Sequence, residues 1–329
     1  MWSGNNHNNA FLLYSVIAIN VIYWVILELA GGSRNVHTLS NFGAIDASKI
    51  YSGQFWRFFS AMFMHIGVMH LIVNTISIFI IGSMVNRFYG SRYFLLIYLV
   101  SGLSGSLGSY AFISATTVGA GASGAVFGCL GALLAYFFIM RSVLGEFGRQ
   151  NLNAIGFIAI LNLGFGFIVP GVDNWAHLGG LASGFLLGTA FTIINQPYLQ
   201  FFNSFAYYRS FGSKYFYIAP ILGLLIFVIS LFVIGNIRAG NTYEGKYVKA
   251  SHLYKKENFE SAQKSIDAAI EKIHPNIIPE FFLLKAKIAL ALGDTANGKK
   301  HLELAIYTGL PPNDREEAIT LLRSLTRNY

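Results

Sequence analysis

One hydroxyl, that of Ser123, stands among small residues in the segment GAGASGA (119–125), where a long apolar stretch begins. A serine at a helix start lies beside free backbone N–H groups and at the positive end of the helix dipole. Such groups can stabilise the oxyanion of an acyl transfer, so Ser123 is a candidate nucleophile. The alternative is a packing residue in a glycine-rich helix start. The segment is not the nucleophile elbow of soluble hydrolases, because Ala125 replaces its final glycine.

A histidine stands at the start of a later apolar stretch, in the segment WAHLGG (175–180). A neutral imidazole can take the proton of a hydroxyl and later return it to a leaving group. His177 is therefore a candidate general base, and the alternative is a buried histidine satisfied by a neighbouring helix. Asp173 lies four residues before His177, but it or Asn174 is interpreted as a helix cap, not as a third catalytic residue.

A third group of polar residues lies in the segment HIGVMHLIVN (65–74). His70 and Asn74 are four residues apart, so they share one helix face, and both can donate hydrogen bonds. His65 is expected to point elsewhere. A metal site is the competing interpretation, but acidic and cysteine partners are missing nearby, so we expect no metal. Just upstream, the aromatic–arginine pair Trp56-Arg57 is typical of an anchor at the membrane edge, with a structural role for Arg57 as the alternative.

The composition places these residues in a membrane. The chain has 329 residues, of which 54% are hydrophobic and 12% charged, against about 25% charged in soluble domains. Residues 1–237 hold 9 Lys/Arg and 4 Asp/Glu, and residues 238–329 hold 14 and 11. The first part is therefore membrane-like and the last part soluble-like. The net charge of +8 includes no basic run, so lipid head groups explain it better than nucleic acid. Cys129 is expected to be a core residue.

Seven apolar stretches are long enough to cross about 30 Å of hydrocarbon, and only helices satisfy their own backbone there. The first is interpreted as a retained span and not as a signal peptide. Glycines three and four residues apart in the third, fourth and sixth stretches predict close helix packing. The fold class is therefore an all-α transmembrane bundle. The spans are 11–30, 58–84, 93–113, 122–140, 151–169, 175–195 and 217–237.

The distribution of Lys and Arg predicts the orientation of the spans. The loops after the second, fourth and sixth spans carry basic residues, and those after the third and fifth carry none, which predicts that the former are cytoplasmic. The long loop after the first span is a partial exception. The N-terminus is then inside, and Ser123, His177, His70 and Asn74 all lie in the outer halves of their spans. The basic residues of the cytoplasmic loops are Arg87, Arg92, Arg141, Arg149, Arg209 and Lys214.

Residues 238–329 are expected to form a small helical repeat domain outside the membrane. The segment 250–275 aligns with 286–311 at an offset of 36, which matches Ala250 with Ala286 and Pro275 with Pro311. Paired helices at this period are similar to tetratricopeptide repeats, which often present a binding surface. We therefore expect this domain to recruit an adaptor or a substrate.

Taken together, these motifs resemble the rhomboid family of intramembrane serine proteases over roughly residues 11–195. The matching segments are Trp56-Arg57, HIGVMHLIVN (65–74), GASG (121–124) and AHLGG (176–180), followed by Gly184. The seventh span and the repeat domain resemble the six-plus-one bacterial members with a repeat tail. The order and the spacing of the segments agree throughout, although each segment alone is weak.

The resemblance implies a role for each matched residue. Ser123 would be the nucleophile, and His177 the base and later the acid. The Ser123 N–H, His70 and Asn74 would form the oxyanion hole, and Gly121 would leave room for the substrate. Four further residues would support the site: Trp56, Arg57, Gly180 and Gly184. Two positions depart from the family pattern. Phe127 stands where some members stack a tyrosine on the histidine, and Asn86 stands where many bacterial members have a glutamate.

The function implied is cleavage of transmembrane helices near the outer face of the plasma membrane, without metal or cofactor. The partners would be transmembrane substrates, the lipid bilayer and an adaptor of the repeat domain. One alternative is a catalytically silent member that binds membrane clients, although such members lack the serine or the histidine. A channel or transporter is another, but a charged relay is missing from the spans.

Overall fold

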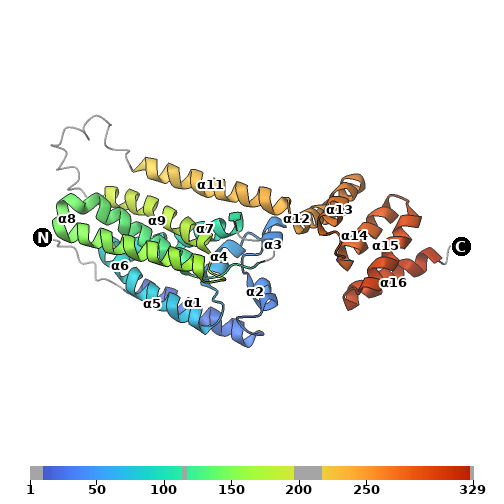
Figure 1. The fold of residues 1–329 in the computed structure, drawn as a ribbon, viewed down its shortest axis with the longest axis horizontal. Coiled ribbons are helices and arrows are strands. Elements are labelled where there is room, and N and C mark those ends of the chain that lie inside the picture. Colours follow the sequence, from blue (N-terminus) through green and yellow to red (C-terminus); the bar gives the residue numbers. More distant parts are fainter. Residues whose placement is uncertain (1–9, 113–116, 196–216, 327–329) are drawn as a thin grey trace. The chain divides into compact units, whose positions relative to one another are not determined.

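The computed structural model describes residues 10–112, 117–195 and 217–326, in which all regular structure is helical apart from one isolated β-bridge (Figure 1). The chain divides into two compact units, Met1–Asp46 with Phe55–Gly235 and Ala47–Gln54 with Asn236–Tyr329. The short segment 47–54 groups with the C-terminal unit, which the sequence pattern does not predict. Two of the basic loop residues, Arg209 and Lys214, lie outside the described residues.

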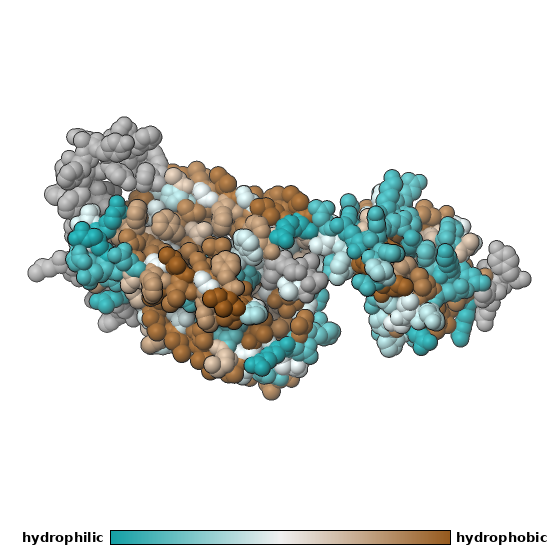
Figure 2. Space-filling model, in the orientation of Figure 1, coloured by the Kyte–Doolittle hydropathy of each residue, from teal (hydrophilic) through white to brown (hydrophobic). Residues whose placement is uncertain are grey.

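Six helices of the described residues are long and apolar enough to cross a membrane, which confirms the expectation of an all-α membrane bundle. Apolar side chains cover much of the surface of the first unit in Figure 2, as they must if lipid surrounds it. The six comprise α1 (Phe11–Leu29), the segment Val68–Tyr89, α7 (Ser91–Phe112), α8 (Ser123–Ile168), α9 (Asn174–Asn195) and α11 (Ile218–Gly240).

The predicted fourth and fifth spans both lie in α8, whose 46 residues would extend about 69 Å if straight. A kink at Gly145 (φ 57°, ψ −131°) divides the helix into two arms, each long enough to cross the membrane. The expected loop between the two spans is therefore wrong, because Arg141 and Arg149 lie on helix. The left-handed φ of Gly145 is readily adopted only by glycine, which explains the position of the kink.

The second span begins at Val68, not at residue 58 as predicted. The apolar run before it forms short helical turns and irregular backbone that ends at Gly67 (φ 79°). The span itself contains one π-helical turn, a feature frequent near functional sites. The short turns before the span are α4 (Arg57–Ser60) and η1 (Ala61–Phe63), and the span consists of α5 (Val68–Ser77), η2 (Ile78–Gly82) and α6 (Ser83–Tyr89).

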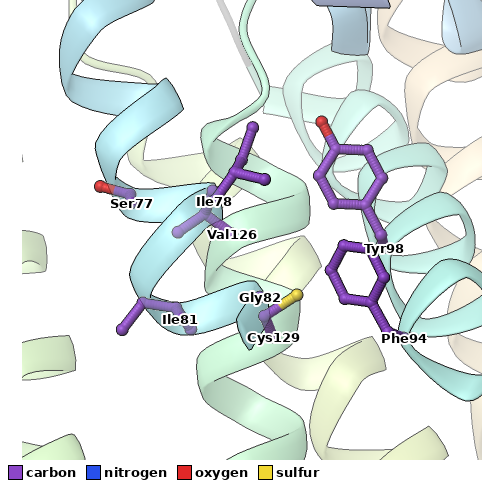
Figure 3. Close-up of a pocket in the computed structure, with 8 residues that line it drawn as sticks. All are labelled: Ser77, Ile78, Ile81, Gly82, Phe94, Tyr98, Val126 and Cys129. Atoms are coloured by element: carbon purple, nitrogen blue, oxygen red, sulfur yellow. The ribbon is translucent and has the colours of Figure 1, made fainter. Parts of the chain in front are cut away.

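The core of the first unit forms around α7, α8 and α9, with α1 and the π turn packed at its side. Figure 3 shows Cys129 of α8 facing Phe94 and Tyr98 of α7 and the π turn. The space between these side chains does not admit a water molecule. Cys129 is thus a fully buried core residue, as expected.

The second unit contains five helices beyond the end of α11. The first two form a pair, α12 with α13, and the next two form a second pair, α14 with α15. Equivalent helices start 36 residues apart, at Tyr243 and Pro279 and again at Phe259 and Thr295, in agreement with the offset in the sequence. The helices are α12 (Tyr243–Lys255), α13 (Phe259–Ile273), α14 (Pro279–Ala291), α15 (Thr295–Thr308) and α16 (Pro312–Thr326).

Candidate active site

Ser123 is the first residue of α8, and the helix start lacks a side-chain cap because Ala122 precedes it. The backbone N–H groups of a first helical turn have no intrahelical partner. The segment before Ser123 is fixed by backbone hydrogen bonds: Ile45 and Gly119 exchange a pair at 2.7 and 3.0 Å, and Gly121 N–H donates to Ala61 O at 3.0 Å. A hydroxyl and free N–H donors are therefore held together on a rigid turn.

His177 lies in the first turn of α9, where Asp173 caps the helix. One Asp173 carboxylate oxygen accepts the N–H groups of Trp175 and Ala176 at 3.1 and 3.0 Å, as expected of a cap. The Nδ1 atom of His177 has no hydrogen-bond partner among the described residues, so a carboxylate does not orient the ring. The ring stacks instead on Phe127 of α8, with centroids 4.2 Å apart and planes at 13°.

Close backbone contact between α8 and α9 brings the neighbourhoods of Ser123 and His177 together. A Cβ atom added to Gly124 would lie 3.2 Å from the carbonyl oxygen of Ala176. These two residues directly follow the serine and precede the histidine. Among the described residues no hydrogen bond joins the Ser123 hydroxyl to the His177 ring. Such bonds are often longer in unliganded enzymes and shorten when substrate binds.

Gly180 and Gly184 are required for this approach of the helices. A Cβ on Gly180 would lie 1.9 Å from the carbonyl oxygen of Gly124, and a Cβ on Gly184 would lie 1.9 Å from that of Gly128. Any side chain at either position would thus collide with the α8 backbone. These glycines set the separation of the helices that carry the serine and the histidine.

His70 of α5 faces the turn that precedes Ser123. Its Nδ1 atom accepts the backbone N–H of Ile66 at 3.3 Å, so in a neutral ring the proton is on Nε2. A Cβ added to Gly121 would lie 2.9 Å from that Nε2 and 3.7 Å from Ser123 Oγ. With a φ of 145° and no side chain, Gly121 therefore leaves a space between an N–H donor and the hydroxyl.

Asn74 lies one turn after His70 and is buried. Its side-chain amide donates one hydrogen bond to His70 O at 3.0 Å, which stays within α5. An amide NH₂ carries two donors, so a second N–H is available beside His70. The structure thus places both predicted donors on one face of α5.

His65 contributes to this region in a way that sequence reasoning missed. The prediction that it points away from His70 is wrong, because His65 precedes the helix and its ring meets that of His70 edge to face, with centroids 5.2 Å apart. It is fully buried and restricts the orientation of the His70 ring. The sequence signal for this contact is the pair of histidines five residues apart. It indicates a contact only once the helix is known to start between them.

Arg57 is not an interfacial anchor, because only 2% of it is exposed. Its guanidinium donates to the carbonyl oxygens of Ser40 and Ala44 at 2.7 and 3.0 Å, and it lies over the ring of Trp56. Arg57 therefore ties α2 (Val36–Phe42) and the loop after it to α4. The neighbouring Ile45 pairs with Gly119, so this loop also supports the segment before Ser123.

The site therefore combines a hydroxyl, an imidazole and several N–H donors, and no group of three or more potential metal ligands occurs among residues 10–112, 117–195 and 217–326. This set of groups can perform an acyl transfer without a Lewis acid. The groups come from α5, α8 and α9, at positions between His70 and His177 of the chain.

The chain is also similar to known proteins. A family model described as the Rhomboid domain matches residues 52–193. Rhomboid protease GluP of Bacillus subtilis is 38% identical over 79% of this chain and 49% of its own length. YdcA of the same organism, whose name assigns it to the rhomboid proteases, is 30% identical over 52% of this chain and 84% of its own. RHOMBOID-like protein 4 of Arabidopsis thaliana is 36% identical over 63% of this chain. The chain spans about half the length of GluP and of this plant relative.

Proposed function

Because the chain belongs to the rhomboid family, we propose that it is an intramembrane serine endopeptidase whose catalytic dyad is Ser123 and His177. The observation that carries this proposal is the backbone contact between Gly124 and Ala176, which are the chain neighbours of the two residues. Two closely packed helices bring a hydroxyl and an imidazole near one another without a third catalytic residue. The dyad is our assignment from geometry and from the resemblance of the motifs.

In the first half of the reaction, Ser123 Oγ attacks the carbonyl carbon of the scissile bond while His177 takes the hydroxyl proton. The tetrahedral intermediate collapses to an acyl-enzyme when His177 returns the proton to the leaving amine. In the second half, His177 deprotonates a water molecule, which attacks the ester and releases Ser123. Stacking on Phe127 holds the imidazole in one plane through both halves.

The developing oxyanion would lie in the space beside Gly121. Three donors would stabilise it: the Ser123 N–H at the uncapped start of α8, the Nε2–H of His70 and the second N–H of Asn74. Preorganised donors of this kind each contribute about 10²–10³ in turnover. Gly121 has no side chain to occupy the oxyanion position.

The substrate would be a transmembrane helix that unwinds near its outer end, since the carbonyl groups of an intact helix are closed to attack. By resemblance to the family, a small residue precedes the cut and helix-weakening residues follow it. We place the protein in the plasma membrane, and the distribution of Lys and Arg supports a cytoplasmic N-terminus and an outward-facing site. The helix pairs of the second unit would recruit a substrate or an adaptor.

Cleavage of a tagged single-span substrate in liposomes tests the proposal. The full chain should cut, and Ser123→Ala and His177→Ala should each lose activity by about three orders of magnitude or more. Ser104→Ala is the matched control, because it removes a buried hydroxyl from α7 that donates only to its own helix. This control should keep the activity of the unmodified chain.

Activity that persists in Ser123→Ala would overturn the nucleophile assignment. If the full chain cut none of several substrates with small residues near the outer edge yet still bound them, the alternative of a client-binding protein would replace the protease. The second outcome can be read from co-purification of the tagged substrate in the same liposomes.

A further inference from the structure

A pocket of about 390 Å³ lies within the second unit, apart from the candidate active site. Its wall combines the last turn of α11, α12 and α13 with Tyr51 of the short helix α3 (Ala47–Tyr51). This volume is within the range of pockets that bind small molecules, about 300–1,000 Å³. The pocket is thus large enough for a ligand and not only for an ion.

The pocket has a strongly positive wall. Lys246 and Lys249 of α12 and Lys264 of α13 line it, and its lining includes no acidic side chain. None of the three lysines forms an ion pair with any residue that the structure describes. The polar groups of Asn241 and Ser265 lie in the same wall. Three unneutralised ammonium groups around one space favour an anion there.

Tight backbone turns hold this wall in shape. A Cβ on Gly245 would lie 1.9 Å from the carbonyl oxygen of Ala239, and a Cβ on Gly240 would lie 2.9 Å from the Tyr51 hydroxyl. The Thr242 hydroxyl caps α12 by accepting the Gly245 N–H at 2.9 Å. Lys246 and Lys249, three residues apart, follow this turn on one face of α12. The glycines therefore place the lysines directly beside the end of α11.

The end of α11 also fixes the depth of the pocket in the membrane. This helix is apolar up to Gly235 and continues with Asn236, Arg238 and the turn that leads to α12. A spanning helix leaves the hydrocarbon where such a change occurs, at the level of the lipid head groups. A basic pocket at this level lies within reach of the phosphate groups of the lipids, which carry the negative charge that its lysines attract.

We propose that this pocket binds the phosphate-bearing head group of an anionic phospholipid. The three lysines neutralise the phosphate, and Asn241 and Ser265 hydrogen-bond its oxygen atoms or the head-group hydroxyls. The bound head group ties the ends of α11, α12 and α13 to one another at the membrane surface. The site is separate from peptide cleavage and does not depend on the proposed function.

The test is native mass spectrometry of the detergent-solubilised full chain with three probes: phosphatidylglycerol, phosphatidylcholine and inorganic phosphate. The full chain should retain phosphatidylglycerol more strongly than phosphatidylcholine. The triple variant K246Q/K249Q/K264Q should lose about tenfold or more in affinity for phosphatidylglycerol, because each lysine near the head groups adds to binding. The variant K246R/K249R/K264R should retain the lipid, since it keeps the charge.

The matched control is K255Q/K256Q/K272Q, which removes the same charge from exposed positions of the same unit outside the pocket. It should bind phosphatidylglycerol within about twofold of the unmodified chain. Equal losses in both triple variants would overturn the proposal in favour of a diffuse charge effect. Retention of phosphatidylcholine as strong as that of phosphatidylglycerol would also overturn the proposal. Displacement of the lipid by inorganic phosphate at a similar concentration would overturn it too, because the pocket would then be a site for soluble anions.

Discussion

The two units of the molecule both consist of packed helices, but they bring their helices together in different ways. In the first unit α8 and α9 meet through backbone, as the contacts of Gly180 and Gly184 show. In the second unit the helices meet through side chains such as Ile266 and Ile288, which are fully buried. Lipid tails are as apolar as leucine, so close contact and not burial from water must hold membrane helices together. Water drives the side chains of the second unit inward.

The starts of the helices differ in the same way. Three helices of the second unit begin with a side-chain cap, from Thr242, Asn258 and Asp294. The helix that begins at Ser123 has no such cap. A cap would occupy the N–H groups that we assign to the oxyanion. These three helix starts are saturated by a side chain, as is that of α9 by Asp173, whereas the proposed catalytic helix start leaves its donors for a substrate.

The largest effect is expected from Gly184→Ala, because one methyl group would lie 1.9 Å from a carbonyl oxygen of α8. A rotamer change cannot relieve a collision with backbone. The loss in the free energy of unfolding therefore reaches or exceeds about 1–3 kcal/mol, the range typical of overpacking. We expect loss of folded protein and of cleavage, measured by size-exclusion chromatography and by the liposome assay.

The matched control is Gly164→Ala on the second arm of α8, where nothing lies within 4 Å of the added atom. This variant should keep its fold and its activity. If Gly184→Ala behaved like the control, the helices would not depend on backbone contact.

A loss of stability confined to the second unit is expected from Ile266→Ala, where the side chain is fully buried among side chains that can partly relax. Substitutions of this kind cost about 2–5 kcal/mol. We expect faster hydrogen exchange in α12 to α14 of the full chain and unchanged exchange in α8 and α9. The control is Ile277→Ala, since that residue is 47% exposed. Similar exchange in both variants would contradict the picture of a side-chain core.

The sequence predicts the positions of membrane-spanning helices in the first unit where the length of an apolar stretch alone determines them. The helices near 11–30 and 175–195 were located closely because a span must satisfy its own backbone. The start of the second span was placed ten residues too early, because the short turns before Val68 are equally apolar. The helical backbone on both sides of the kink at Gly145 is also not predicted, since Arg141 and Arg149 are typical of a loop. Hydropathy indicates which residues lie in lipid, but it does not indicate whether their backbone is helical or irregular.

The candidate site shows the same limit. Ser123, His177, His70 and Asn74 could be singled out because polar groups inside spans require a reason. Their proximity depends on helix contacts that only the glycine spacing suggested. The contact of His65 with His70 and the carbonyl partners of Arg57 follow from irregular backbone, which has no periodic signature. The pocket of three lysines likewise combines segments about 200 residues apart in the chain.

An intermediate effect is expected from Asp294→Ala, which removes the cap of α15. Asp294 accepts the backbone N–H of Asn297 at 3.1 Å, and loss of such a cap leaves a first-turn N–H of the helix without a side-chain partner. Hydrogen exchange should rise in the first turn of α15, and cleavage should not change. Asp294→Asn is the control, because its side-chain oxygen can still accept the bond and should restore protection. Equal exchange in both variants would mean that charge and not capping matters there.

The smallest effect is expected from Glu317→Gln, which breaks the ion pair with Lys287 that links α16 to α14 at 2.7 Å. The glutamate side chain is 50% exposed, so solvent screens the attraction, and exposed pairs contribute about 0.2–1 kcal/mol. Hydrogen exchange in α16 should rise slightly at low salt and should match that of the unmodified chain at high salt. A larger effect, or one that salt does not reduce, would show that this unit is held by charge as well as by its apolar side chains. The two units would then differ in electrostatics as well as in the way their helices pack.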